Sequence, residues 1–287
     1  MKPAPFEYHD PRAIDEAVAL LARYGDDAKI LAGGQSLLPM LNLRLARPAA
    51  VIDINRVAGL DDIAETDGTV RAGALVRQRV FERWASRRLP IVAAGLALVG
   101  HAAIRNRGTV AGSIAHADPA SELPALLLCL DGAVVARSAG GEREIAAADF
   151  FQGPLMTAAR ADELVTHTRW SLPPAGAGWG FHEVARRHGD FALVGVAAML
   201  TVSAGLVQQA RVALFGAGAT PVRARHAEAA LTGQRLSADV IAEAATQAAA
   251  EIEPDSDLHA TAVYRRRAGR TLVTRALTDA ADRAGRA

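Results

Sequence analysis

The first sixty residues predict a strand, a glycine turn, a helix and a second strand, in that order. Residues 28–32 form a short apolar run typical of a buried strand, and residues 50–54 form another. Between them, Gly33-Gly34-Gln35-Ser36 interrupts the apolar pattern. Residues 37–45 then follow with helix-like spacing until Arg47-Pro48 breaks it. We therefore expect a tight turn that leads from a strand into a helix.

The middle of the chain mixes strand-like and helix-like patterns. The elements we expect are a hairpin over 61–73 with its turn at Asp67-Gly68, helices over 76–84 and 90–100, a helix that starts at Asp118-Pro119 and runs through 123–128, and strands over 133–137 and 163–172. Residues 105–113 are polar and rich in glycine, which predicts a loop.

A proline- and glycine-rich linker, residues 173–178, divides the chain. We expect a first domain over residues 1–174, with subdomains of about 1–56 and 57–174, and a second over 179–287. Beyond the linker, the pattern predicts three strands followed by three helices, at 181–186, 191–202, 206–215, 224–231, 238–252 and 261–284. This order favours an α+β fold with a three-stranded sheet in the second domain.

Composition excludes several classes of protein. The 287 residues carry a net charge of +1, which argues against a dedicated nucleic-acid or membrane-surface protein. Cys129 is the single cysteine, so the chain alone can form no disulfide and no cysteine-held iron–sulfur cluster. The uncharged residues 191–210 are better explained by two strands joined at 203–205 than by a membrane span. No targeting signal begins the sequence, and we expect a cytoplasmic protein.

Two segments have the character of anion-binding loops. The first is Ala32-Gly33-Gly34-Gln35-Ser36, where small residues between a strand and a helix let backbone N–H groups approach a phosphate. A plain tight turn explains this segment about as well. The second runs from Gly108 to Glu122 and combines small residues with an acidic helix start. For Asp118 the simpler interpretation is helix capping, and for Glu122 it is a solvated carboxylate in the first helical turn.

Together these segments resemble the FAD-binding medium subunits of molybdenum hydroxylases, of the carbon monoxide dehydrogenase and xanthine dehydrogenase type. Residues 32–39, Ala-Gly-Gly-Gln-Ser-Leu-Leu-Pro, resemble the first flavin motif of that family, and residues 109–124 resemble the second. The likeness extends to residues 181–187 and 190–192 and covers essentially the whole chain. It implies a two-subdomain FAD-binding domain of the vanillyl-alcohol-oxidase-like type, followed by a smaller α+β domain.

The resemblance also implies which residues contact FAD. The backbone of the first loop would hold the pyrophosphate, Thr109, Gly112 and Ser113 would close from the second loop, and Glu122 would contact the sugar portion. Leu164 and Val165 fall where apolar residues flank the adenine. His182 occupies a position where relatives often have lysine near the isoalloxazine ring, although a structural histidine is about as plausible there. The complete expected set is Ala32, Gly33, Gly34, Gln35, Ser36, Leu37, Thr109, Gly112, Ser113, Asp118, Glu122, Leu164, Val165 and His182.

Two departures from the family pattern lead to predictions. Relatives usually have a glycine pair in the second loop, whereas this chain has Ala111 first, so we predict an ordinary negative φ there. Gln35 stands where some relatives carry histidine, so we expect dissociable, non-covalent FAD. The eight histidines are scattered, and we expect no metal site in this chain.

The leading hypothesis is an FAD-binding electron-transfer subunit. By resemblance, a small partner would carry two [2Fe-2S] clusters, a large partner would carry the molybdenum (molybdopterin) cofactor and oxidise the substrate, and the assembly would be a dimer of heterotrimers. The alternatives are a self-contained FAD oxidase or dehydrogenase of the same fold, and a non-enzymatic nucleotide-binding or assembly protein. The substrate stays open among carbon monoxide, purines, aldehydes and N-heterocycles, and the acceptor among NAD, quinone, a cytochrome and oxygen.

Overall fold

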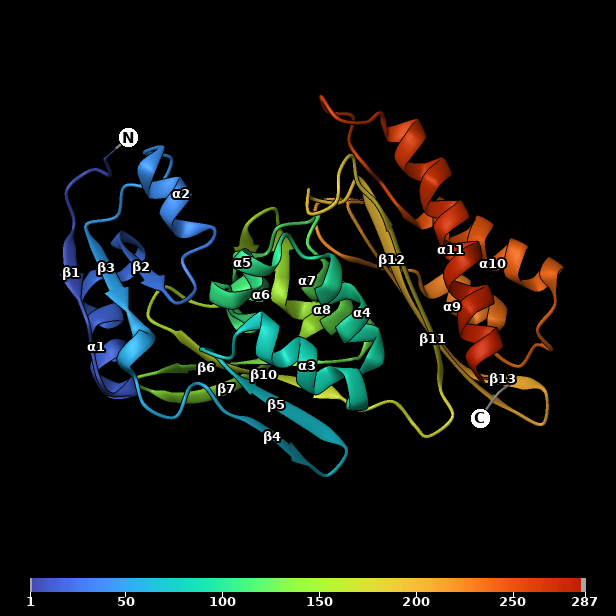
Figure 1. The fold of residues 1–287 in the computed structure, drawn as a ribbon, viewed down its shortest axis with the longest axis horizontal. Coiled ribbons are helices and arrows are strands. Elements are labelled where there is room, and N and C mark those ends of the chain that lie inside the picture. Colours follow the sequence, from blue (N-terminus) through green and yellow to red (C-terminus); the bar gives the residue numbers. More distant parts are fainter. Residues whose placement is uncertain (1, 285–287) are drawn as a thin grey trace.

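The computed structural model describes residues 2–284 and places its three larger sheets side by side along the long axis of the molecule (Figure 1); a fourth sheet has only two strands. The N-terminal sheet is parallel, with strand order β1-β3-β2. Its elements are β1 (Glu7–His9), α1 (Ile14–Tyr24), the 3-10 turn η1 (Gly25–Asp27), β2 (Ala28–Leu31), α2 (Leu37–Asn42), β3 (Ala50–Asp53) and the 3-10 turn η2 (Ile54–Arg56). The predicted strand, turn, helix and strand are all present, and α2 ends at Asn42 instead of residue 45.

The central part is an antiparallel sheet of order β4-β5-β10-β6-β7, covered by helices. Its elements are β4 (Ile63–Thr66), β5 (Thr69–Gly73), α3 (Gln78–Arg88), α4 (Pro90–Leu98), α5 (Ala102–Arg107), α6 (Val110–His116), α7 (Glu122–Cys129), β6 (Ala133–Ser138), β7 (Gly141–Ala146), α8 (Ala147–Phe150), β8 (Phe151–Gly153), β9 (Met156–Thr157) and β10 (Leu164–Ser171). The segment 105–113, expected as a loop, is mostly helical, because Val110, Ala111 and Ile114 turn one face of α6 into the core.

The C-terminal part packs helices against one face of an antiparallel sheet of order β11-β12-β13-β14. Its elements are β11 (Gly178–Val184), β12 (Val194–Ser203), β13 (Leu206–Phe215), β14 (Val222–Arg223), α9 (Arg225–Leu231), α10 (Ala238–Glu251) and α11 (Ala262–Ala284). The three predicted strands form this sheet, and the two-residue β14 extends its edge. Ala204 and Gly205, both with positive φ, form the predicted turn between β12 and β13.

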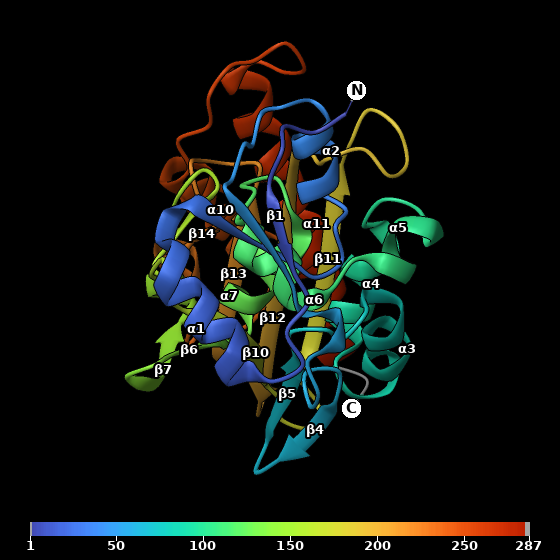
Figure 2. The same ribbon diagram turned by 90° about the vertical axis from the view of Figure 1, so that its left-hand side faces the viewer.

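The opposite face of the C-terminal sheet packs against the central helices. Phe181 and Phe215 belong to the same buried cluster as Leu126 of α7 and Leu96 of α4. Figure 2 views the molecule from the N-terminal end and shows α6 and α7 in front of the strands β11–β13. The central helices therefore lie between two sheets. Within residues 2–284, no helix is long and apolar enough to cross a membrane.

Candidate functional site

The first predicted loop, residues 32–36, leaves the end of β2 and enters α2. Gly34 has φ +73°, a conformation that glycine adopts without the steric penalty of a side chain. Within residues 2–284, the backbone N–H groups of residues 33–37 donate to no protein acceptor. The side chain of Gln35 folds back and donates to the carbonyl oxygen of Gly33 over 3.1 Å. The loop therefore presents a run of unused N–H donors, which is what an anion requires.

The second predicted loop forms the start of α6. Thr109 is the N-cap residue, and its hydroxyl accepts a hydrogen bond of 3.0 Å from the N–H of Gly112. A Cβ added at Gly112 would lie 2.5 Å from that hydroxyl oxygen, so the cap requires glycine at this position. Ser113 continues the same first turn. Ala111 lies inside the helix and is absent from the residues with positive φ, which confirms the predicted negative φ.

The two loops are in direct contact. A Cβ added at Gly33 would lie 2.6 Å from the carbonyl oxygen of Arg107 and 2.7 Å from the Cα of Gly108. Real Cβ atoms do not approach backbone atoms so closely, so only glycine permits this packing. The fold thus brings together the two sequence segments that were predicted to act on one ligand.

Asp118 does not cap a helix, contrary to the sequence expectation. Its carboxylate accepts a hydrogen bond of 2.9 Å from the N–H of Ala120, and its carbonyl oxygen accepts one of 3.0 Å from Ser121. Residues 118–121 therefore form a turn, Ser121 is the N-cap residue, and α7 begins at Glu122. The Asp-Pro pair therefore begins a turn that precedes the helix, and not the helix itself.

Glu122 is a buried acid and not the solvated carboxylate of the simpler interpretation. Its residue exposure is 5%, and this burial raises its pKa to about 8, with the charges of Glu183 and Asp118 adding to the effect. Glu183 comes from β11, and burial raises its pKa to about 7. Its Oε2 atom is buried and has no hydrogen-bond partner within the described chain. Two acids thus meet at the junction between the central helices and the C-terminal sheet.

His182 faces away from this junction. Its Nε2 lies 3.2 Å from the carboxylate of Asp279 on α11. Since neighbouring residues of a strand point to opposite faces, Glu183 points toward the central helices. The placement of His182 is that of a structural histidine and gives no support to a role near the isoalloxazine ring. The alternation along β11 was the signal in the sequence that would have placed His182 and Glu183 on opposite faces of the strand.

Leu164 and Val165 open strand β10 behind the second loop. Leu164 is buried in the same cluster as Ala111, and Val165 is half-buried and packs against that cluster. Leu164 therefore supports the second loop from behind. Val165 is the more accessible of the two residues.

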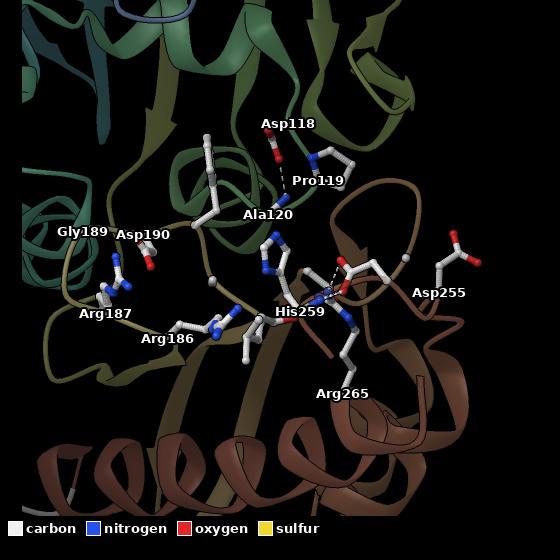
Figure 3. A pocket seen from close by; sticks show the side chains of 16 residues that line it. Asp118, Pro119, Ala120, Arg186, Arg187, Gly189, Asp190, Asp255, His259 and Arg265 are labelled. Atoms are coloured by element: carbon white, nitrogen blue, oxygen red, sulfur yellow. Dashed lines mark hydrogen bonds and ion pairs between the residues drawn. The ribbon is translucent and has the colours of Figure 1, made fainter. Parts of the chain in front are cut away.

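A cavity of about 700 Å³ lies beside the second loop, between residues 118–120 and the C-terminal part of the chain (Figure 3). Arg186, Arg187 and Asp190 line it from the segment that follows β11, and Arg265 lines it from α11. The N–H of Gly216 donates to the carbonyl oxygen of Pro119 over 2.7 Å and fixes one wall of the cavity. The cavity has both charged and apolar walls and lies next to Asp118 of the second predicted flavin motif. Within residues 2–284, no group of three or more side chains is arranged to hold a metal ion.

Comparison with known families agrees with this geometry. Residues 4–171 match the FAD-binding domain found in molybdopterin dehydrogenases, and residues 179–280 match the C-terminal domain of the carbon monoxide dehydrogenase flavoprotein. The chain therefore belongs to the FAD-binding subunits of the molybdenum hydroxylases, and it is an oxidoreductase subunit of the medium-chain type.

Two curated relatives match it over nearly their whole length. It is 42% identical to the 6-hydroxypseudooxynicotine dehydrogenase complex subunit alpha of Paenarthrobacter nicotinovorans, over 99% of this chain and 97% of the relative. It is 37% identical to the carbon monoxide dehydrogenase medium chain of Hydrogenophaga pseudoflava, over 98% of both chains. A solved structure of carbon monoxide dehydrogenase from that organism superposes with a TM-score of 0.96 at 40% identity and covers 99% of both chains. The predicted fold class is confirmed.

Proposed function

We propose that the two loops hold FAD non-covalently, with its pyrophosphate against the first loop. The observation that carries this proposal is the contact between the loops, which places the unused N–H groups of residues 33–37 beside the Thr109 cap. The close approach at Gly33 and the positive φ of Gly34 are the features that an extended diphosphate requires of a backbone. The residues present thus fit the cofactor.

Glu122 and the second loop complete the proposed site. Thr109, Gly112 and Ser113 would face the flavin and phosphates, and Glu122 would accept hydrogen bonds from sugar hydroxyls. Because Glu122 is buried and shielded from water, each such hydrogen bond would give its carboxyl group a partner that solvent does not supply. The cavity beside Asp118 would leave one side of the site open to an electron acceptor.

The protein would act as the electron-transfer subunit of a three-component complex. Bound FAD supplies the redox chemistry, and the chain binds, orients and partly encloses it. We propose that [2Fe-2S] clusters on a small partner deliver the electrons, that a large molybdenum-cofactor partner oxidises the substrate, and that an external acceptor removes the electrons. Relatives whose names describe them as subunits of a complex or as medium chains support this arrangement.

Native mass spectrometry of the tagged chain, purified from its own host, tests the proposal. We expect a large molybdopterin-containing chain, a small iron–sulfur chain and one FAD per copy of this chain. A yellow homo-oligomer without partners would favour the self-contained oxidase. A folded chain that takes up no FAD would favour the nucleotide-binding or assembly protein.

Denaturation tests the non-covalent linkage. The first loop offers Gln35 where a histidine would be needed for attachment. The thiol of Cys129 is buried, which raises its pKa to about 12 and leaves it unreactive. We expect all flavin to leave the polypeptide in acid or guanidinium, and yellow colour that stays with the denatured chain would contradict this.

A further inference from the structure

Arg77 lies directly behind the second loop, on the segment that joins β5 to α3. The N–H of Val110 donates to the carbonyl oxygen of Val76 over 3.0 Å, and the N–H of Gln78 donates to that of Gly108 over 2.9 Å. These two bonds bind the main chain on either side of Arg77 to the second loop. The backbone of Arg77 is therefore fixed relative to that loop before its side chain makes any contact.

The guanidinium of Arg77 connects the second loop to the first. Its Nη1 donates to the carbonyl oxygen of Arg107 over 2.5 Å, and its Nη2 donates to Oδ1 of Asn55 over 2.6 Å. The Nδ2 of Asn55 donates in turn to the carbonyl oxygen of Ala32 over 2.8 Å. We call this chain of three hydrogen bonds the Arg77–Asn55 bracket. It joins the carbonyl oxygen of Ala32 in the first loop to that of Arg107, the residue directly before the second loop.

Asn55 is itself held in one orientation. Its backbone N–H and its Nδ2 both donate to Oδ1 of Asp53, over 2.9 and 2.6 Å. The other oxygen of Asp53 accepts a hydrogen bond of 2.8 Å from the hydroxyl of Tyr8. The bracket is therefore anchored to strands β1 and β3 of the N-terminal sheet. A shift of the first loop would have to break this anchor.

The bracket determines which way the first loop presents its donors. In a planar trans peptide, the C=O and the next N–H point in opposite directions. Because Asn55 holds the carbonyl oxygen of Ala32, the N–H of Gly33 must point away from Asn55. That N–H has no acceptor within residues 2–284. The bracket thus leaves one donor of the loop unpaired and fixes its direction.

We propose that Arg77 and Asn55 are positioning residues for the cofactor pyrophosphate: the bracket sets the spacing of the two loops and aims the first loop's N–H groups at the ligand. This inference rests on the proposed function, in which the loops hold FAD. Arg77 acts through Asn55 and the loop carbonyls, and its Nη1 and Nη2 are already engaged there. Lysine should not replace it, because all three donors of an ammonium group sit on one nitrogen, which cannot occupy the positions of both Nη1 and Nη2.

A double-mutant cycle on the full chain, freed of flavin, tests the bracket. The variants are R77M, N55A, the double variant and R77K, with R83M as a matched control on the exposed face of α3. The readouts are the dissociation constants of FAD and of ADP, which carries the same pyrophosphate, and of riboflavin, which lacks it. Thermal unfolding of each flavin-free variant separates loss of positioning from loss of fold.

We expect R77M and N55A each to weaken FAD and ADP roughly ten- to hundredfold. The double variant should be little weaker than either single variant, R77K should not restore binding, and R83M and the riboflavin constants should stay unchanged. Additive losses, or rescue by R77K, would show a direct charge effect and overturn the inference, as would unchanged FAD binding in R77M. Failure of the unmodified chain to bind FAD would instead overturn the proposed function.

Discussion

The acid pair Glu122 and Glu183 makes the stability of the flavin-free protein depend on pH in an unusual direction. Burial raises the pKa of Glu122 to about 8 and that of Glu183 to about 7. An unfolded glutamate releases its proton near its ordinary pKa of 4.5. Between these pH values the folded chain keeps protons that the unfolded chain has lost. Folding therefore takes up protons, and the free energy of unfolding falls as the pH rises.

The size of the effect follows from the shift at Glu122. Each unit of pKa difference corresponds to about 1.4 kcal/mol, so a rise from 4.5 to about 8 removes about 5 kcal/mol of stability by pH 8. About 3 kcal/mol of this loss falls between pH 6 and pH 8. Glu183 adds to the loss in the same direction, by a smaller amount because it is partly exposed.

Urea unfolding of the flavin-free chain between pH 6 and pH 9 measures this dependence. E122Q keeps the shape of the side chain and removes its ionisation, so its curve should be shallower than that of the unmodified protein by about 1.4 kcal/mol per pH unit up to pH 8. E253Q, which changes an exposed glutamate, should follow the unmodified protein. If E122Q and the unmodified protein ran parallel across this range, the assignment of a buried, proton-holding Glu122 would be wrong.

Three further predictions concern packing and buried charge. G33A should weaken FAD binding more than tenfold, because the new Cβ would lie 2.6 Å from the carbonyl oxygen of Arg107 and 2.7 Å from the Cα of Gly108; equilibrium titration checks this, with G140A as the control, where the new Cβ would make only an ordinary contact at 3.6 Å. E163Q should lower the free energy of unfolding by about 3 kcal/mol at pH 7, since a hydrogen bond from Arg143 holds the pKa of this carboxyl at about 2. This difference should disappear as the pH falls from 4.5 toward 2, and equal stability of both forms at pH 7 would contradict it. R223M should cost about 3 kcal/mol in urea unfolding, because it removes the buried partner of Glu228 and leaves this buried carboxylate only the exposed Arg225 at 3.5 Å, and a change below 1 kcal/mol would refute this.

Sequence reasoning was most successful where the local pattern and the tertiary structure agree. The turn at residues 203–205 and the capped helix that begins after Ser237 follow from turn and capping chemistry alone. The two candidate anion-binding loops were singled out because their small residues are contiguous. Local structure of this kind depends on neighbours in the chain, and the sequence displays those neighbours directly.

The missed features are those that depend on distant partners. Helix α6 looked like a loop because Gly112 lowers its helix propensity, and burial of its apolar face stabilises it together with the Thr109 cap. His182 was selected as a candidate from the resemblance alone, because the sequence does not show which face of β11 its side chain occupies. The docking of α11 against that strand decides which residue turns inward.

The sequence by itself determined the α+β class, the family, and the two segments that the proposed function assigns to FAD. Only the tertiary structure decided how those segments meet. Gly33 touches residues 107–108, which lie more than seventy positions away in the chain, and Arg77 and Asn55 join the same two loops without belonging to any motif. The physical reason is that Arg77 and Asn55 donate to backbone carbonyl oxygens, which every residue carries. Which side chain comes within reach of such an oxygen is decided by the fold and leaves no pattern in the sequence.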